Sequence, residues 1–158
     1  MLINFNLNNK DVTIETRPDR RVVDLLREDF NLTGTKEACG SGECGTCTIL
    51  INGTTKLSCL MLAAQLEGIK VTTIEGLSRE DTNQLHPLQE AFIEGGAIQC
   101  GFCTPGMVLT AHELLQKNPH PNESEIRTAI SGNLCRCTGY QKIIESIRLA
   151  AAGKPGDA

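Results

Sequence analysis

The sequence contains few large aromatic side chains and no long apolar segment. Aromatic residues make up only 3% of its 158 residues, with no tryptophan and a single tyrosine. Halves of about 75 residues bury little apolar surface and often need a bound metal or a covalent cross-link. No run of residues is long and apolar enough to span a bilayer, so we expect no membrane partner. The sequence therefore predicts small domains that need support beyond a hydrophobic core.

Excess positive charge and an export signal are also missing. The formal net charge is -4 at pH 7, which argues against a nucleic-acid partner, because such proteins carry basic patches. Charged residues after Arg20 and Arg21 interrupt any apolar export region. We therefore expect a cytoplasmic protein, whose cysteines are more often metal ligands than disulfides. Export together with a signal-bearing partner stays open as an alternative.

Cysteine, by contrast, is abundant, and the eight cysteines form two sets of four. The first set has the spacing C-x4-C-x2-C, with a fourth cysteine after eleven further residues. The second set has a C-x2-C pair and, much later, a C-x-C pair. Four thiolates are what a [2Fe–2S] cluster requires, and the first spacing is typical of plant-type ferredoxins. The candidate ligand sets are Cys39, Cys44, Cys47 and Cys59, and Cys100, Cys103, Cys135 and Cys137.

Glycines favour a cluster over zinc at the first set. Gly40, Gly42 and Gly45 interleave with the cysteines, and glycine permits the positive φ and close backbone approach that a loop around a cluster requires. Structural zinc sites usually have two short C-x2-C pairs, whereas this set ends in a single distant cysteine. The second set is less specific, because its spacing alone leaves a zinc site open.

The hydrophobic pattern predicts strands in the first half of the chain. Alternation and β-branched runs indicate strands over residues 2–7, 12–14, 48–51, 55–59 and 71–74. A short helix around residues 22–26 would pack on them, which gives a compact α+β unit. Asn52 and Gly53 are a strong signal for a tight hairpin turn. Cys59 is thereby expected on the return strand of this hairpin.

The second half is predicted to be helical. Helix start signals are found at Pro87, Thr104, Asn122 and Thr138. Gln141 would complete a capping box with Thr138, which would place Cys135 and Cys137 at a helix start. Four short helices with short connections indicate a small bundle. We therefore expect two domains, at residues 1–76 and 83–153, and a frayed tail at residues 154–158.

Three motifs resemble those of one enzyme family. Residues 36–48, KEACGSGECGTCT, are similar to the ferredoxin loop of the molybdenum hydroxylase small subunit, in the family of xanthine dehydrogenase, aldehyde oxidoreductase and carbon monoxide dehydrogenase. QCGFCTPGM and GNLCRCTGYQ resemble the family's second cluster motif. Ala38 stands where many members have glycine. The resemblance implies a β-grasp plant-type ferredoxin domain followed by an all-α four-helix-bundle domain, each with one [2Fe–2S] cluster.

The resemblance also implies a function. The chain would be an electron-transfer subunit that carries electrons from molybdopterin on a large subunit, through two clusters, to FAD on a medium subunit. It would not be catalytic alone. In the family, the positions of Gln99 and Cys137 lie against the pterin.

The residues alone leave two other classes of function open. One is a free-standing, two-cluster ferredoxin-like shuttle, and the other is a zinc-stabilised interaction module. The substrate of the complex is not encoded in any motif of this chain. Among the substrates of the family, we favour xanthine or another purine.

Overall fold

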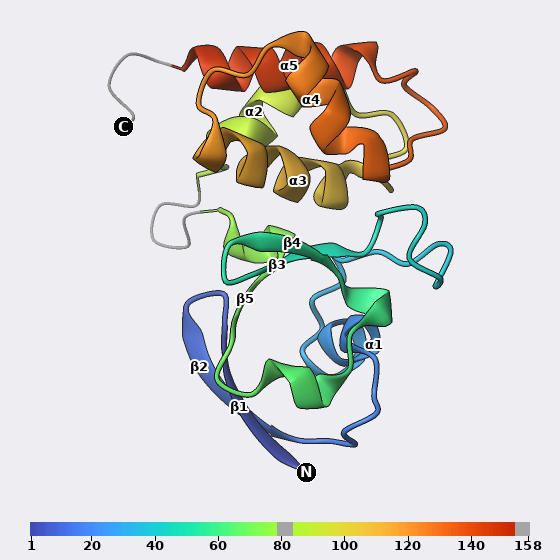
Figure 1. The fold of residues 1–158 in the computed structure, drawn as a ribbon, viewed down its shortest axis with the longest axis vertical. Helices are drawn as coiled ribbons and strands as arrows, with labels where there is room; N and C mark the ends of the chain where they lie inside the picture. Colours follow the sequence, from blue (N-terminus) through green and yellow to red (C-terminus); the bar gives the residue numbers. More distant parts are fainter. Residues whose placement is uncertain (79–83, 154–158) are drawn as a thin grey trace.

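The first half of the chain forms a five-stranded mixed sheet in this computed structural model, which describes residues 1–78 and 84–153 (Figure 1). The strands are β1 (Leu2–Leu7), β2 (Lys10–Glu15), β3 (Thr48–Ile51), β4 (Thr54–Leu57) and β5 (Lys70–Thr72). Their order is β2-β1-β5-β3-β4, with β1 parallel to β5 and the other neighbours antiparallel. Asn52 and Gly53 make the predicted hairpin turn, with φ of 49° and 81°.

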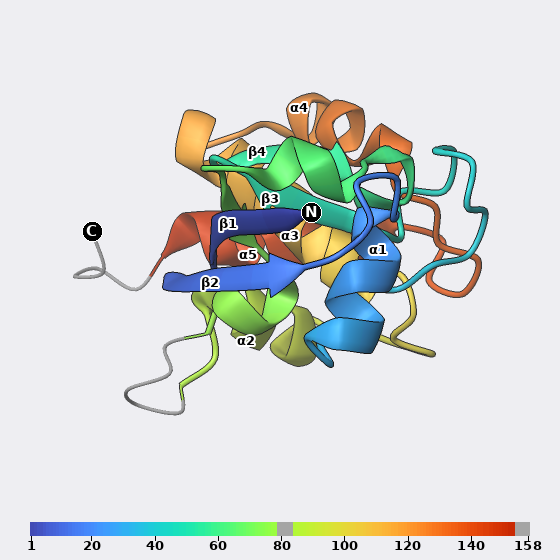
Figure 2. The same cartoon turned by 90° about the horizontal axis from the view of Figure 1, so that it is seen from below.

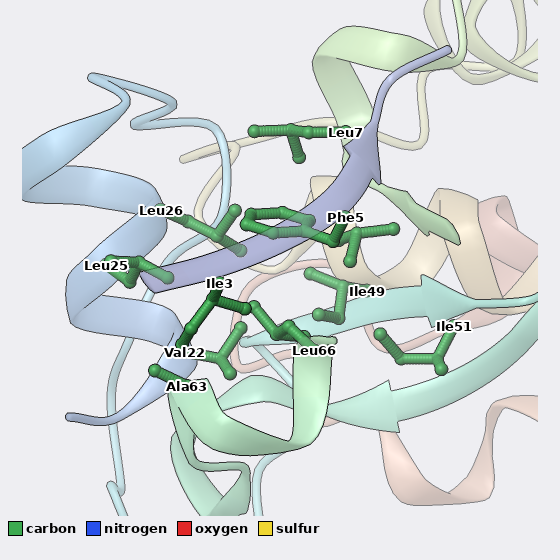
Figure 3. Packing of buried hydrophobic residues seen from close by; sticks show 11 residues of the cluster. Ile3, Phe5, Leu7, Val22, Leu25, Leu26, Ile49, Ile51, Ala63 and Leu66 are labelled. Carbon is green, nitrogen blue, oxygen red and sulfur yellow. The ribbon is translucent and has the colours of Figure 1, made fainter. Parts of the chain in front are cut away.

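One face of this sheet is covered by a short helical segment. Along β1, Ile3, Phe5 and Leu7 are buried, as expected for alternating strand residues. The helix α1 (Val22–Asp24) continues into a π-helical turn at Leu25–Asp29. Its apolar side chains pack against those of β1 in one cluster, which Figure 3 shows from close by. This core supports the loop that carries the first cysteines.

The second half folds into four helices with a core of their own. These are α2 (Pro87–Glu94), α3 (Thr104–Lys117), α4 (Glu123–Ala129) and α5 (Gln141–Ala152). Asn122 and Glu125 form the capping box predicted at the start of α4. The predicted α+β domain followed by a helical domain is confirmed.

The two halves meet where α3 packs on β3 and β4 (Figure 1). All four residues of β3 are buried, which explains why its sequence is a continuous run rather than an alternation. Ile49 and Ile51 belong to the core of the sheet, so Thr48 and Leu50 lie on the face toward α3. Seen from below, β1 and β2 lie in front of α3 and α5, with α2 and α4 on opposite sides (Figure 2).

Two local predictions are wrong. The strand β4 ends at Leu57, and Cys59 lies instead in a 3₁₀ turn, Ser58–Leu60. Thr138 does not cap α5, because its hydroxyl group lies 3.0 Å from the sulfur of Cys135. The residue before α5 is Tyr140, in a left-handed conformation with φ of 70°.

The predicted domain bounds stay a prediction. The start of the second domain at residue 83 and the tail at residues 154–158 lie outside the described residues. Ile74 and Leu77, near the end of the first predicted domain, pack against the core of the helical domain. Within residues 1–78 and 84–153, no helix has both the length and the apolar character needed to cross a bilayer.

Candidate metal centres

The first cysteine set lies in the loop that enters β3 and in the turn that follows β4. Cys39 is exposed and Cys44 is half-buried, whereas Cys47 and Cys59 are buried. Val23 of α1 packs against the two buried cysteines. Cys47 and Cys59 therefore belong to a small buried cluster beside the core of the sheet, whereas Cys39 and Cys44 lie in the glycine-rich loop.

Backbone N–H groups of this loop converge on the sulfur of Cys39. The N–H groups of Ser41, Glu43 and Cys44 donate to Cys39 Sγ at 3.4, 3.3 and 3.4 Å. These donors, that of Ser41 first, lower the pKa of the Cys39 thiol from 9.0 to about 6. Inward N–H groups of this kind stabilise a thiolate and would also stabilise an anionic cluster.

The two buried thiols lie next to each other. Burial, followed by a hydrogen bond with the Cys47 thiol, raises the pKa of Cys59 from 9.0 to about 11. The N–H of Gly42, whose φ is 83°, points to Cys59 and lowers the pKa of its thiol, although burial has the larger effect. Metal ligation needs thiolates, so a metal bound here would displace the protons that burial retains.

The second cysteine set joins the start of α3 to the loop before α5. Cys103 is the residue that precedes α3, and its thiol lies close to that of Cys135. The thiols of Cys100 and Cys137 are close to each other in the same way. Cys135 and Cys137 lie in a loop that ends at Tyr140, so they are not at the start of α5 as predicted. One helix N-terminus, not two, reaches this set directly.

Three thiols of the second set differ in the direction in which their pKa is shifted. Burial, followed by a hydrogen bond with Cys135, raises the pKa of Cys103 from 9.0 to about 12. Burial also acts on Cys135, but the hydroxyl and N–H of Thr138, at 3.0 and 3.5 Å from its sulfur, outweigh this effect and lower its pKa. The pKa of Cys137 is raised, mainly by its hydrogen bond with Cys100. Thr138 thus stabilises one thiolate of the set.

Six of the eight cysteine sulfurs lie in adjacent pairs. In the described ranges 1–78 and 84–153, no three His, Cys, Asp or Glu side chains are arranged to hold a single metal ion. The adjacent pairs are Cys47 with Cys59, Cys103 with Cys135, and Cys100 with Cys137. A [2Fe–2S] cluster takes two protein ligands on each iron. The paired thiols and the inward N–H groups therefore fit a two-iron cluster in each loop.

The two cysteine loops are in direct contact. The N–H of Leu134 donates to the carbonyl oxygen of Cys44 at 2.8 Å. One residue further on, the N–H of Cys135 donates to the hydroxyl oxygen of Tyr140 at 2.9 Å. One backbone hydrogen bond therefore connects Cys44 of the first set with Leu134, the residue before Cys135 of the second set.

Gln99 and Cys137, the expected pterin contacts, are both exposed. Gln99 directly precedes Cys100, whose thiol is paired with Cys137, so both residues lie at the outer side of the second set. Sequence reasoning assigned no role to Asn133, which is buried between the two loops. Only its position inside the GNLCRC string pointed to it, because a lone polar residue has no periodicity that marks it as buried.

Comparison with known proteins assigns the chain to a family. Residues 5–72 match the family described as a 2Fe-2S iron-sulfur cluster binding domain, and residues 73–148 match the [2Fe-2S] binding domain. The chain is 53% identical to the nicotinate dehydrogenase small FeS subunit of Eubacterium barkeri, over 94% of this chain and 93% of that protein. The chain belongs to the family of molybdenum hydroxylase iron–sulfur subunits.

Other relatives match this chain over nearly their whole length. The nicotine 6-hydroxylase small subunit of Paenarthrobacter nicotinovorans is 47% identical, over 98% of this chain and 92% of that protein. A chain of quinoline 2-oxidoreductase from Pseudomonas putida 86 superimposes with a TM-score of 0.92 at 48% identity, covering 96% of this chain and 93% of that chain. The predicted resemblance is thereby confirmed, and this iron–sulfur subunit is part of an oxidoreductase.

Proposed function

We propose that this chain is the electron-transfer subunit of a molybdenum hydroxylase complex. It would carry electrons from molybdopterin on a large partner subunit to FAD on a medium partner subunit. The observation that carries this proposal is the direct contact between the two loops that bring the two sets of four cysteines together. [2Fe–2S] clusters held by these loops would supply one-electron transfer.

The proximity of the thiols supports an assignment of ligands to individual irons. Cys47 and Cys59 would share one iron of the first cluster, which leaves Cys39 and Cys44 for the other. In the second cluster, the pairs would be Cys103 with Cys135 and Cys100 with Cys137. The chain's own contribution is to hold the sulfurs as thiolates and to surround them with N–H donors.

Exposure supports an order for the two sites. The second set presents Cys100 and Cys137 at the surface next to Gln99, so a pterin held by the large subunit would reach this set first. In the first set, Cys47 and Cys59 are buried and Cys39 is exposed. Electrons would leave toward FAD from the side of Cys39.

The names of the relatives support a class of substrate. Nicotinate, nicotine and quinoline, which appear in those names, are all aromatic rings that contain nitrogen. We therefore propose that the complex hydroxylates a nitrogen heterocycle, a class that includes the purines favoured from the sequence. We also propose, as expected from the sequence, that the complex is located in the cytoplasm.

Serine substitution in each set tests the assignment of two independent clusters. The complex is purified anaerobically, and iron, acid-labile sulfide and the paramagnetic signals of the reduced protein are measured. Replacing Cys103 with Ser should abolish one signal and spare the other. Replacing Cys47 with Ser, the matched control in the first set, should abolish the other signal.

Other outcomes would support the two alternatives. Colourless protein that holds zinc and no acid-labile sulfide would support a zinc-stabilised module. An iron-loaded chain that elutes as a monomer from cell extract would support a free shuttle. Loss of both signals to the same extent in each variant would contradict two independent sites.

A further inference from the structure

One buried amide side chain connects the two cysteine loops. Asn133 is 6% exposed. Its Nδ2 donates to the carbonyl oxygen of Gly45 at 3.1 Å and to the hydroxyl oxygen of Thr48 at 3.4 Å. Its Oδ1 accepts a hydrogen bond from the hydroxyl group of Thr110 on α3 at 2.9 Å. The amide therefore uses its donor toward the first loop and its acceptor toward the helical domain.

This contact runs beside the backbone hydrogen bond between the same loops. Leu134 donates to Cys44 at 2.8 Å, and Asn133 donates to Gly45. Consecutive residues of one loop thus bind consecutive residues of the other. Two adjacent hydrogen bonds fix the local orientation and separation of the loops more closely than one bond would, within the wider packing of α3 on β3 and β4.

Two glycines allow the backbones of the two cysteine loops and of α3 to approach one another closely. A Cβ atom on Gly45 would lie 2.2 Å from the carbonyl oxygen of Gly132, and a Cβ atom on Gly106 would lie 2.6 Å from that of Gly45. Both approaches are possible only for glycine. The carbonyl oxygen of Gly45 also accepts from the N–H and the hydroxyl group of Thr48, at 3.2 and 2.6 Å, so the amide of Asn133 adds the donor that comes from the other cysteine loop.

We propose that Asn133 is a positioning residue that fixes the distance and orientation between the two cluster sites. The proposal rests on the proposed function. No hydrogen bond joins the side chain of Asn133 to a cysteine sulfur, and it acts through the backbone of Gly45 and through Leu134. Thr110 orients the amide of Asn133, so it is a second positioning residue at the same contact.

Asn133→Asp tests the role of the donor. The variant keeps the acceptor for Thr110 and replaces Nδ2 with an oxygen that faces the carbonyl of Gly45. Two neighbouring unpaired spins split or broaden each other's paramagnetic signals, and this effect falls steeply with distance. In the reduced, iron-loaded complex we expect the mutual splitting to be clearly weaker in Asn133→Asp than in the wild type. Both individual signals and the iron content should be retained.

Two further variants keep the test decisive. Thr110→Val removes only the bond that orients the amide, so it should weaken the splitting less than Asn133→Asp does. Asn9→Asp, at an exposed turn between β1 and β2, is the matched control and should leave the splitting unchanged. If Asn133→Asp takes up no iron, Thr110→Val decides the question in its place.

The outcomes separate this inference from the proposed function. A wild-type complex without iron would overturn the proposed function, and with it this inference. Two wild-type signals that do not affect each other would overturn the positioning role alone. The same holds if Asn133→Asp, or Thr110→Val in its place, retains the wild-type splitting.

Discussion

Tyr140 combines an unfavourable backbone conformation with two compensating hydrogen bonds. Its φ of 70° is left-handed, which costs a non-glycine residue roughly 1 kcal/mol or more. Its hydroxyl oxygen accepts from the N–H of Cys135 at 2.9 Å, and its own N–H donates to the hydroxyl oxygen of Thr138 at 3.3 Å. The strain is therefore tied to the loop that carries Cys135, which is where a fixed geometry is needed.

Gly45→Ala should destabilise the chain more than Gly53→Ala, although both glycines are left-handed. Gly53 has φ of 81° and nothing within 4 Å of an added Cβ atom, so the variant should cost about 1 kcal/mol through backbone strain alone. In Gly45→Ala the added atom would also meet the backbone of Gly132, so the total should be roughly 3 kcal/mol. Urea unfolding of the reduced chain, followed by circular dichroism, measures both. Equal losses of unfolding free energy would mean that the packing between Gly45 and Gly132 relaxes to admit a methyl group.

Elements with a strong local signal could be predicted from the sequence. The strand β1 follows from alternation, and the start of α4 follows from Asn122 and Glu125. The start of α5 could not be predicted, because the sulfur of Cys135 competes there for the hydroxyl and N–H of Thr138. The spacing predicted which cysteines group together. It could not predict Asn133, whose partners lie 23 to 88 residues away.

Asn122→Ala should shorten or fray α4. The side chain of Asn122 accepts from the N–H of Glu125 at 3.0 Å, and Glu125 Oε2 accepts from the N–H of Asn122 at 2.7 Å. Removing the cap should cost about 1 kcal/mol of unfolding free energy, measured by thermal or urea unfolding of the reduced chain. Ser124→Ala, at an exposed position in the same helix, is the control and should cost nothing. Equal effects of the two variants would show that the cap contributes no stability.

At the scale of the whole molecule, α3 connects the domains at two points. Its first turn carries Gly106, which packs against Gly45 of the first cysteine loop. Further along, Glu113 is 8% exposed and accepts hydrogen bonds from the N–H and the hydroxyl group of Thr55 on β4, at 2.9 and 2.6 Å. The helix is thereby anchored along its length, which holds the helical domain in one orientation on the sheet.

The anchor at Glu113 should make the stability of the chain depend on pH. Burial by itself would raise the pKa of Glu113, but hydrogen bonds from Lys117 and Thr55 outweigh it and lower the pKa below its ordinary value of 4.5. Since the folded pKa is the lower one, the ionised carboxylate stabilises the fold above pH 4.5. This contribution is lost as the pH falls through the lowered pKa.

Glu113→Gln should therefore be less stable than the parent near neutral pH, by about 1 kcal/mol, because it retains an acceptor for Thr55 but loses the charge. The difference between the two proteins should shrink as the pH falls below 4.5, the ordinary pKa of the group. Urea unfolding of the reduced, iron-free chain over a pH series measures it without interference from acid loss of iron. Glu123→Gln, at a partly exposed ion pair with Arg127 on α4, is the matched control. Parallel stability curves for the parent and Glu113→Gln would mean that the charge of Glu113 does not hold the domains together.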